Sequence, residues 1–316
     1  MRRKKRSRTG KAAFIAFAAL FAALAVACIL HGDGMKRWAG QWRPGETRLG
    51  RAVGRIVKSP DSRQKPAPAE RAAPAKQKIA ILIDDIGCDL APVRELLGME
   101  APIAFAVLPY CPHALEASDM IHRTGREILL HLPMEPHAYP EVEPGPDALL
   151  LSMPEHELIG KIEKNLQGVR HIGGVNNHMG SRFMEDEEKL SVVLGCLKKK
   201  GYYFVDSRTT GASKGPEVSG KIGLRFMSRH IFIDNNQDYT YILDALNHIP
   251  EKQDPRNHGE PRLIIGHPYP ATIGALREAI PHLKARGIEI VPVSKAIGIT
   301  EERKAVASAT ASKGAH

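Results

Sequence analysis

From residue 78 onward, short apolar segments alternate with longer segments in which apolar residues recur at helical spacing. The short segments are rich in Ile, Leu and Val, which is typical of parallel strands covered by helices on both faces. Eight segments fit this description: 79–84, 103–108, 127–132, 174–178, 203–206, 230–234, 263–267 and 289–293. Seven or eight strand–helix units favour an α/β fold in which parallel strands form a distorted (β/α) barrel rather than an open doubly wound sheet.

Three of the intervening segments carry helix signals. Ser152 and Glu155 have the spacing of a capping box, which predicts that a helix opens there. Segments 185–200 and 272–286 are each followed by a glycine, and the first runs from acidic residues to lysines, as a helix dipole favours. No glycine-rich phosphate loop follows the first predicted strand, so the pattern does not indicate nucleotide binding.

The start of the chain predicts export. Residues 1–11 carry seven Lys or Arg, and residues 12–30 form an unbroken apolar run of nineteen residues. A helix of that length spans roughly 28 Å, enough to cross a bilayer core. The run is interpreted as an uncleaved inner-membrane anchor, with a cleaved signal peptide or lipidation at Cys28 as alternatives. Each of these interpretations places the remainder in the periplasm or otherwise outside the cytoplasm.

The charge distribution argues against a nucleic-acid partner. The chain has a formal net charge of +10, but residues 1–77 hold 18 of the 45 basic and 4 of the 35 acidic residues. The remainder therefore carries 27 basic and 31 acidic residues, a balance of −4. Segment 31–76, rich in Pro, Ala and Arg, is predicted to be a disordered linker, and 301–316 a disordered tail. The predicted folded domain is thus 77–300.

The four cysteines, Cys28, Cys88, Cys111 and Cys196, show no Cys-x-x-Cys spacing and predict no thiolate zinc site. Cys88 and Cys111 are candidates for a disulfide in an oxidising compartment, but the sequence does not fix the distance between them.

Polar residues gather where the predicted strands end. They occur in the segments Asp84–Gly87, His131–Glu135, Asn176–Arg182, Asp206–Arg208, Asp234–Asn235 and Gly266–Pro268. In a parallel barrel these ends share one face, where active sites of such folds are built. Two carboxylates and three histidines on one rim suit a first-row metal ion, with zinc as the leading candidate.

Structural interpretations compete at each position. Asp84 and Asp85 could cap a helix, and Asp206 with Arg208 could form a structural ion pair. Taken singly, each of the three strand-end histidines could be a hydrogen-bonded core residue; the other candidates, His113, His122, His137 and His171, are assigned to the surface. The metal site is favoured because the same residue class recurs at the end of one strand after another.

Residues 78–294 resemble the divergent polysaccharide deacetylases, a branch of the polysaccharide deacetylase superfamily (carbohydrate esterase family 4). The segment Ile83-Asp84-Asp85-Ile-Gly87 is similar to the family's opening motif, and the strand that ends in His131 matches the first half of its second motif. The strand that ends in His267, followed by a helix and a final strand, is similar to the last motif. Two departures stand out: Glu135 replaces the second histidine of the second motif, and Asn176–Arg182 replaces an Arg-x-Pro-Tyr motif.

The resemblance implies a metal-dependent hydrolase that removes N-acetyl groups from a polysaccharide or peptidoglycan-type glycan of the envelope. It assigns Asp84 as the base, His267 as the acid, and Asp206 and Arg208 as orienting residues. Metal binding is assigned to Asp85, His131 and His178, and substrate contacts to Glu135, Asn177 and Arg182. Glu135 stays open as the third metal ligand in place of His178, or as a residue that orients a ligand.

Two alternatives remain open at this point. One is a barrel that has lost its chemistry and acts as a glycan- or protein-binding module in envelope assembly. The other is a metal-dependent hydrolase of a different amide or ester.

Overall fold

The computed structural model describes residues 77–249, 260–298 and 300 of the 316-residue chain. The strands are β1 (Lys78–Ile86), β2 (Ala104–Val107), β3 (Ile128–Met134), β4 (Gly174–Met179), β5 (Tyr203–Asp206), β6 (Phe226–Ser228), β7 (Ile231–Phe232), β8 (Arg262–Gly266) and β9 (Glu289–Ile290). The helices are α2 (Ala91–Leu97), α3 (Ala114–His122), α4 (Glu155–Gln167), η1 (Phe183–Glu185), α5 (Glu187–Lys199), α6 (Gly215–Ile222), α7 (Tyr239–Asn247) and α8 (Pro270–Ala285).

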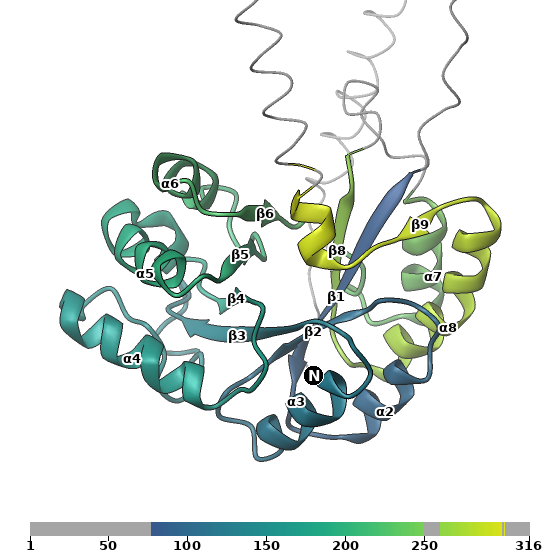
Figure 1. Ribbon diagram of the computed structural model, residues 1–316, viewed down its shortest axis with the longest axis horizontal. Coiled ribbons are helices and arrows are strands. Elements are labelled where there is room, and N and C mark those ends of the chain that lie inside the picture. Colours follow the sequence, from purple (N-terminus) through teal and green to yellow (C-terminus); the bar gives the residue numbers. More distant parts are fainter. Residues whose placement is uncertain (1–76, 250–259, 299, 301–316) are drawn as a thin grey trace, which may run out of the picture. The chain divides into compact units, whose positions relative to one another are not determined.

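The strands form one parallel sheet in the order β6-β5-β4-β3-β2-β1-β8-β7, and β9 pairs with the start of β1. The sheet curls, and the helices lie along its outer side (Figure 1). The expected distorted (β/α) barrel of seven or eight parallel strands is therefore confirmed.

A bent stretch of chain joins the two edges of this sheet. Only Arg229 and His230 separate β6 from β7, yet β6 pairs with β5 and β7 pairs with β8. At the bend the Arg229 N–H donates to a β5 carbonyl group, and the His230 N–H donates to a β8 carbonyl group. The sequence predicted one strand over 230–234. The structure has the two-residue β7 there, preceded by β6, which was not predicted.

Alternate residues of β1 pack on opposite faces of the sheet. Ile79, Ile81 and Ile83 belong to the larger core under the helices, whereas Ala80 and Leu82 face a smaller core inside the curl. The inner core also contains Ala104, Ala106, Val291, Val293, Ala296 and Ile297. Because the strand alanines are small, the final described segment of the chain fits inside the curl and fills it.

The predicted capping box is wrong, although the helix exists. Helix α4 begins at Glu155 with Pro154 as its N-cap, and no side chain caps it. A residue that precedes proline is disfavoured in helical conformation, so Met153 cannot continue the helix back to Ser152. Helix α5 begins later than predicted, because Asp186 caps it by accepting from the Lys189 N–H.

Asp84 and Asp85 do not cap a helix either. Helix α2 begins at Ala91 without a side-chain cap on its N-cap residue, Leu90. The nearest carboxylate to that helix start is Asp89, which accepts from the Ala91 N–H at 2.9 Å. The pair at the end of β1 is therefore available for another role.

The predictions for 1–11, 12–30, 31–76 and 301–316 lie outside the described residues. Within the described ranges, no helix combines the length and the apolar character that a membrane span requires.

Candidate functional site

The end of β1 is held in an unusual backbone conformation. Asp85 has φ 56° and Gly87 has φ 114°, both in the left-handed region. A Cβ atom at Gly87 would lie 3.2 Å from Ala114 Cα and 3.3 Å from Cys111 Cβ, so only glycine fits there. The adjacent Cys88 forms a disulfide with Cys111, with 4.7 Å between their Cα atoms. These constraints fix the turn that presents the Asp85 carboxylate.

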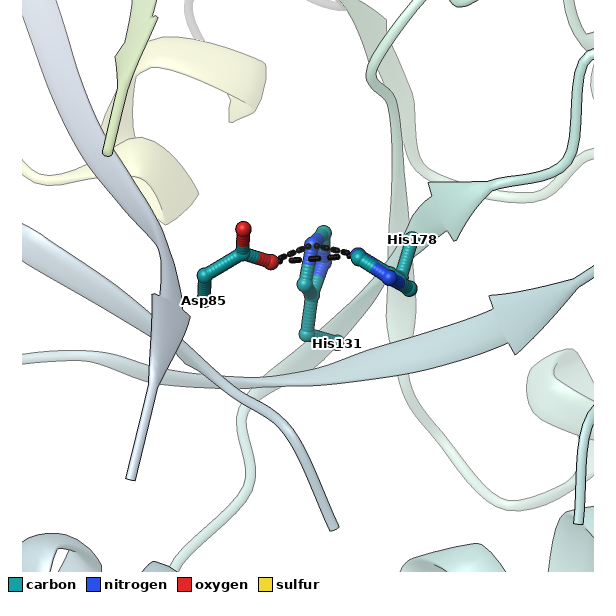
Figure 2. Close-up of side chains that lie close together, drawn as sticks. All are labelled: Asp85, His131 and His178. Atoms are coloured by element: carbon teal, nitrogen blue, oxygen red, sulfur yellow. Dashed lines mark hydrogen bonds and ion pairs between the residues drawn. The ribbon is translucent and has the colours of Figure 1, made fainter. Parts of the chain in front are cut away.

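Asp85, His131 and His178 come together on this rim. Asp85 Oδ1 lies 3.2 Å from His131 Nε2 and 3.1 Å from His178 Nδ1, and the two nitrogens are 3.1 Å apart. Figure 2 shows the three side chains pointing toward one another from separate strands. Zinc bound tetrahedrally at 2.0–2.1 Å would separate its ligands by roughly 3.3–3.4 Å. The triangle is therefore close to one face of such a coordination shell.

One atom of the Asp85–His131–His178 triangle favours a cation at this position. Asp85 Oδ1 is buried and has no hydrogen-bond partner among the described residues, although both imidazole nitrogens are close. Burial alone would raise the pKa of Asp85, but His131 and His178 against its carboxylate outweigh that effect and lower the pKa. An ionised carboxylate with an unsatisfied buried oxygen fits a metal ion.

Asn176 orients both His131 and Asp84. Its Oδ1 lies 3.0 Å from His131 Nδ1, and its Nδ2 donates to Asp84 Oδ1 at 2.8 Å and to Ser207 Oγ at 3.2 Å. With Nδ1 bonded to the amide oxygen, Nε2 of His131 is the nitrogen that presents its lone pair to a metal. Asn176 was among the polar residues at the predicted strand ends, but it was not among the predicted site residues. The alternation of side chains along β4 puts it on the same face as His178, which was the available signal.

Asp84 is buried beside the triangle without belonging to it. Its Oδ2 lies 3.8 Å from His131 Nε2. Burial raises the pKa of Asp84 above its ordinary value, although His131 and His267 act in the opposite direction. Asp84 is thus a better proton acceptor than an exposed aspartate.

His267 is supported by Asp234, which ends a predicted strand but was not among the predicted site residues. His267 Nδ1 lies 3.0 Å from Asp234 Oδ1, and Asp234 Oδ2 accepts from the His267 N–H and from Thr272 Oγ1. Burial alone would lower the pKa of His267, but the bond to Asp234 and its charge raise it. The ring also stacks on Phe232, with 5.7 Å between centroids.

Asp206 and Arg208 contact each other, but not as an ion pair of side chains among the described contacts. Asp206 Oδ1 accepts from the Arg208 backbone N–H at 2.7 Å, and its Oδ2 accepts from Ser213 Oγ at 2.7 Å. Burial raises the pKa of Asp206 although these donors lower it. The carboxylate holds the loop after β5 and does not reach the triangle.

Three residues were predicted to contact substrate: Glu135, Asn177 and Arg182. They lie at the same rim, where their side chains form hydrogen bonds within the protein. Buried Glu135 accepts from the Leu151 N–H at 2.7 Å and from Arg182 Nη1 at 2.8 Å. Asn177 Oδ1 accepts from the Ser207 N–H at 2.8 Å. The structure therefore brings His178, and not Glu135, to Asp85 and His131. The histidines assigned to the surface are all exposed.

Comparison with known proteins gives one family. The family model with the description divergent polysaccharide deacetylase matches residues 81–297 of this chain, which include the whole site. An uncharacterized protein from Haemophilus influenzae is 32% identical over 212 residues, 66% of this chain and 73% of that protein. The uncharacterized protein YibQ of Escherichia coli is 32% identical over 206 residues, 65% of this chain and 63% of that protein, less than two thirds of its length.

A solved structure is similar as well. The uncharacterized protein ATU2773 from Agrobacterium tumefaciens C58 is 25% identical, with a TM-score of 0.63 over 72% of this chain and 91% of that chain.

Proposed function

Because this chain belongs to the divergent polysaccharide deacetylase family, we propose that it is a metal-dependent hydrolase that removes N-acetyl groups from a polysaccharide or peptidoglycan-type glycan. The observation that carries the proposal is the convergence of Asp85, His131 and His178 on the rim that also holds Asp84 and His267. Amide hydrolysis needs an electrophilic centre, a base and an acid, and this set of side chains offers all three.

Zinc is the cation that we propose for the triangle. Two imidazole nitrogens and one carboxylate oxygen are a donor set used by catalytic zinc sites, which keep a fourth position open. A zinc ion bound there would polarise the acetyl carbonyl group and lower the pKa of water at the site. The role of the chain is to supply an ionised Asp85, and a His131 whose orientation is set by Asn176.

Asp84 is proposed to accept the proton of the attacking water. Asn176 Nδ2 donates to Asp84 Oδ1 at 2.8 Å. The other carboxylate oxygen, Oδ2, is the one that lies 3.8 Å from His131 Nε2 of the triangle. The raised pKa that burial gives Asp84 strengthens it as a base.

His267 is proposed to protonate the sugar amine as the amide bond breaks. Asp234 occupies its Nδ1, so Nε2 is the nitrogen available for transfer. Because the pKa of His267 is raised, a larger fraction of its ring is protonated near neutral pH, as an acid in this role requires.

Acetate release by the full chain tests the proposal. The chain is stripped of metal, reloaded with zinc, and mixed with acetylated chito-oligomers and peptidoglycan fragments. We expect release only after reloading, and we expect Asp84→Asn to lower kcat by roughly 10²- to 10⁴-fold with zinc stoichiometry unchanged. Asp89→Asn is the matched control, because it removes the same charge and its amide oxygen can still accept from the Ala91 N–H.

The rival proposal is a barrel that binds a glycan or protein without chemistry. Glu135 favours it, since the resemblance expects a metal-binding histidine there, and Glu135 is occupied by Leu151 and Arg182. If the zinc-loaded wild type binds these glycans but releases no acetate, the rival holds. Release from a different amide or ester alone would assign the same site to another substrate.

We also propose that the barrel lies outside the cytoplasm, attached to the inner membrane or exported. The disulfide between Cys88 and Cys111 supports this, because such bonds persist in oxidising compartments. A basic start followed by nineteen apolar residues supports it as well. A reporter that is active only in the periplasm, fused after Lys76, should give a signal. Activity of a cytoplasmic reporter at that position would contradict the proposal.

A further inference from the structure

A groove follows the free edge of β6. Its volume is about 610 Å³, within the range of ligand pockets, and it is lined by α6, by β6 and by Glu260 and Pro261, which precede β8. Among the described residues β6 pairs only with β5, which leaves this side of the strand open. We call this cavity the β6 groove; its charged and titratable lining residues are Arg208, Arg225, Arg229, His230 and Glu260.

The β6 groove concentrates positive charge. Three arginines face one glutamate, a balance of +2 (3 − 1), whereas the chain from residue 78 onward has a balance of −4. His230 Nδ1 accepts from the Leu263 N–H at 3.0 Å, and partial desolvation together with the nearby arginines lowers the pKa of His230 to about 4, so the ring is neutral at pH 7. The positive charge is therefore local and does not follow from the composition of the domain.

None of the three arginines has a carboxylate partner among the described residues. Arg229 donates to the carbonyl oxygens of Ser207 and Arg208, and Arg225 lies over the Tyr203 ring. The Arg208 guanidinium makes no hydrogen bond or ion pair in the described part of the chain. By contrast, the arginines 170, 182 and 277 pair with carboxylates at 2.6 to 2.8 Å. Burial and the charge of Arg208 lower the pKa of Arg229, and the charges of Asp206 and Asp84 offset this only in part, without a direct ion pair to the guanidinium.

The β6 groove adjoins the candidate site. The Arg229 guanidinium lies 3.7 Å from the centroid of the Phe232 ring, and Phe232 stacks on His267. Ser207, whose carbonyl oxygen accepts from Arg229, also accepts from Asn176, which holds Asp84. A polymer that places one unit at His267 and continues past Phe232 would therefore reach Arg229. From there the lining of the groove follows β6 back to Arg225, just before that strand.

We propose that the β6 groove binds carboxylate or phosphate groups of an anionic glycan whose acetylated sugar lies at the Asp85–His131–His178 triangle. This inference rests on the proposed function and specifies its substrate class. Guanidinium groups bind such oxyanions in a bidentate manner. A glycan is favoured over an acidic peptide because its acetylated sugar would bind at the triangle, and the contacts from Arg229 to Phe232 and from Phe232 to His267 connect the groove with the site.

Binding by the full chain, loaded with zinc, tests the inference. Three chito-oligomers of equal length serve as probes: acetylated and neutral, carboxymethylated, and phosphorylated. We expect at least one charged oligomer to bind about tenfold more tightly than the neutral one, and Arg208→Ser combined with Arg225→Ser to abolish the difference. Arg225→Ser alone should halve the preference or more, and leave binding of the neutral oligomer unchanged.

Arg94→Ser combined with Arg123→Ser is the matched control, because it removes two exposed arginines that make no ion pair among the described residues. The basic residues before 77 are present in every variant, so their contribution cancels. The inference is overturned if neither charged oligomer is preferred, or if the control loses as much affinity as the groove variant. It is also overturned if polyglutamate outcompetes both charged oligomers, which would assign the groove to an acidic peptide.

Acetate release is measured in the same samples and separates the two proposals. Groove-dependent binding without acetate release would refute the deacetylase while the groove stands. The opposite result is acetate release that is equal for neutral and charged oligomers and does not change when the arginines are replaced. It would refute anion binding by the β6 groove and leave the proposed deacetylase activity in place.

Discussion

The rim of the barrel carries two kinds of carboxylate with buried oxygen atoms. Asp85 keeps an oxygen that no donor among the described residues satisfies, and two imidazoles stand against it. Asp206 and Glu135 occupy comparable strand ends, but their oxygens accept from backbone N–H groups and from Ser213 or Arg182. Both kinds are carboxylates at or next to the carboxyl ends of parallel strands. The difference lies in whether the protein itself supplies the donors.

The pKa shifts of Asp206 and Asp85 differ in direction in the same way. Burial raises the pKa of Asp206, and its Ser213 hydroxyl and backbone donors are too weak to reverse that. Burial acts in the same sense on Asp85, yet His131 and His178 lower its pKa. Isolating a buried charge costs several kcal/mol, so the unsatisfied carboxylate is the one arranged to receive a cation.

The largest expected effect comes from changing one carboxylate of each kind to its amide. Asp85→Asn keeps a residue that tolerates the left-handed conformation, and we expect zinc affinity to fall by more than about 100-fold with the unfolding transition little changed. Glu135→Gln should do the opposite: zinc affinity stays, and about 1 kcal/mol of unfolding free energy is lost with the Arg182 ion pair. Chelator competition measures the first quantity and urea unfolding the second. The reversed pattern would make Glu135 the third ligand.

The two adjacent asparagines of β4 sharpen the comparison at a smaller scale. Asn176→Leu removes the groups that hold His131 and Asp84, so we expect zinc affinity to fall roughly 10- to 100-fold. Asn177→Leu is its control on the opposite face, where the side chain holds the Ser207 N–H. That variant should lose stability and keep its zinc affinity, both followed by the same two assays. Equal loss of zinc affinity in both would show a general disturbance of β4.

The smallest effect is expected at Asp234. Its charge and hydrogen bond raise the pKa of His267, so imidazolium persists to higher pH in the wild type. Asp234→Asn lowers that pKa, and the protonated fraction then disappears at lower pH. The alkaline limb of the kcat/KM profile should move toward acid, with a loss of roughly two- to tenfold at neutral pH and little change in acid. An alkaline limb that stays in place would remove His267 from the role of acid.

The strands that are buried on both faces could be predicted from the sequence, because continuous apolar runs such as those of β1 and β5 have no other stable placement. Strand β6 could not, since its three residues pair on one side only and leave no run to detect. The start of α4 was misplaced because Pro154 overrides the spacing between Ser152 and Glu155.

The candidate site also has a part that could be predicted from the sequence and a part that could not. Its members were found because each ends a strand and parallel strands share a rim. Their partners were not, because the bonds from Asn176 to Asp84 and from Asp234 to His267 join residues 92 and 33 positions apart. The disulfide between Cys88 and Cys111 also depends on a distance that the sequence does not give.

Strand β1 also has a mechanical consequence. It begins beside β9, where the Glu289 N–H donates to the Gln77 carbonyl group, and its last two residues are Asp85 and Ile86, at the site end of the strand. Between these points Ile79 to Ile83 are registered against β8 in a parallel ladder. Tension on the chain at Gln77 would load that ladder in shear, so every one of its hydrogen bonds shares the force. The turn that positions Asp85 is thereby insulated from a pull on the chain until the ladder yields.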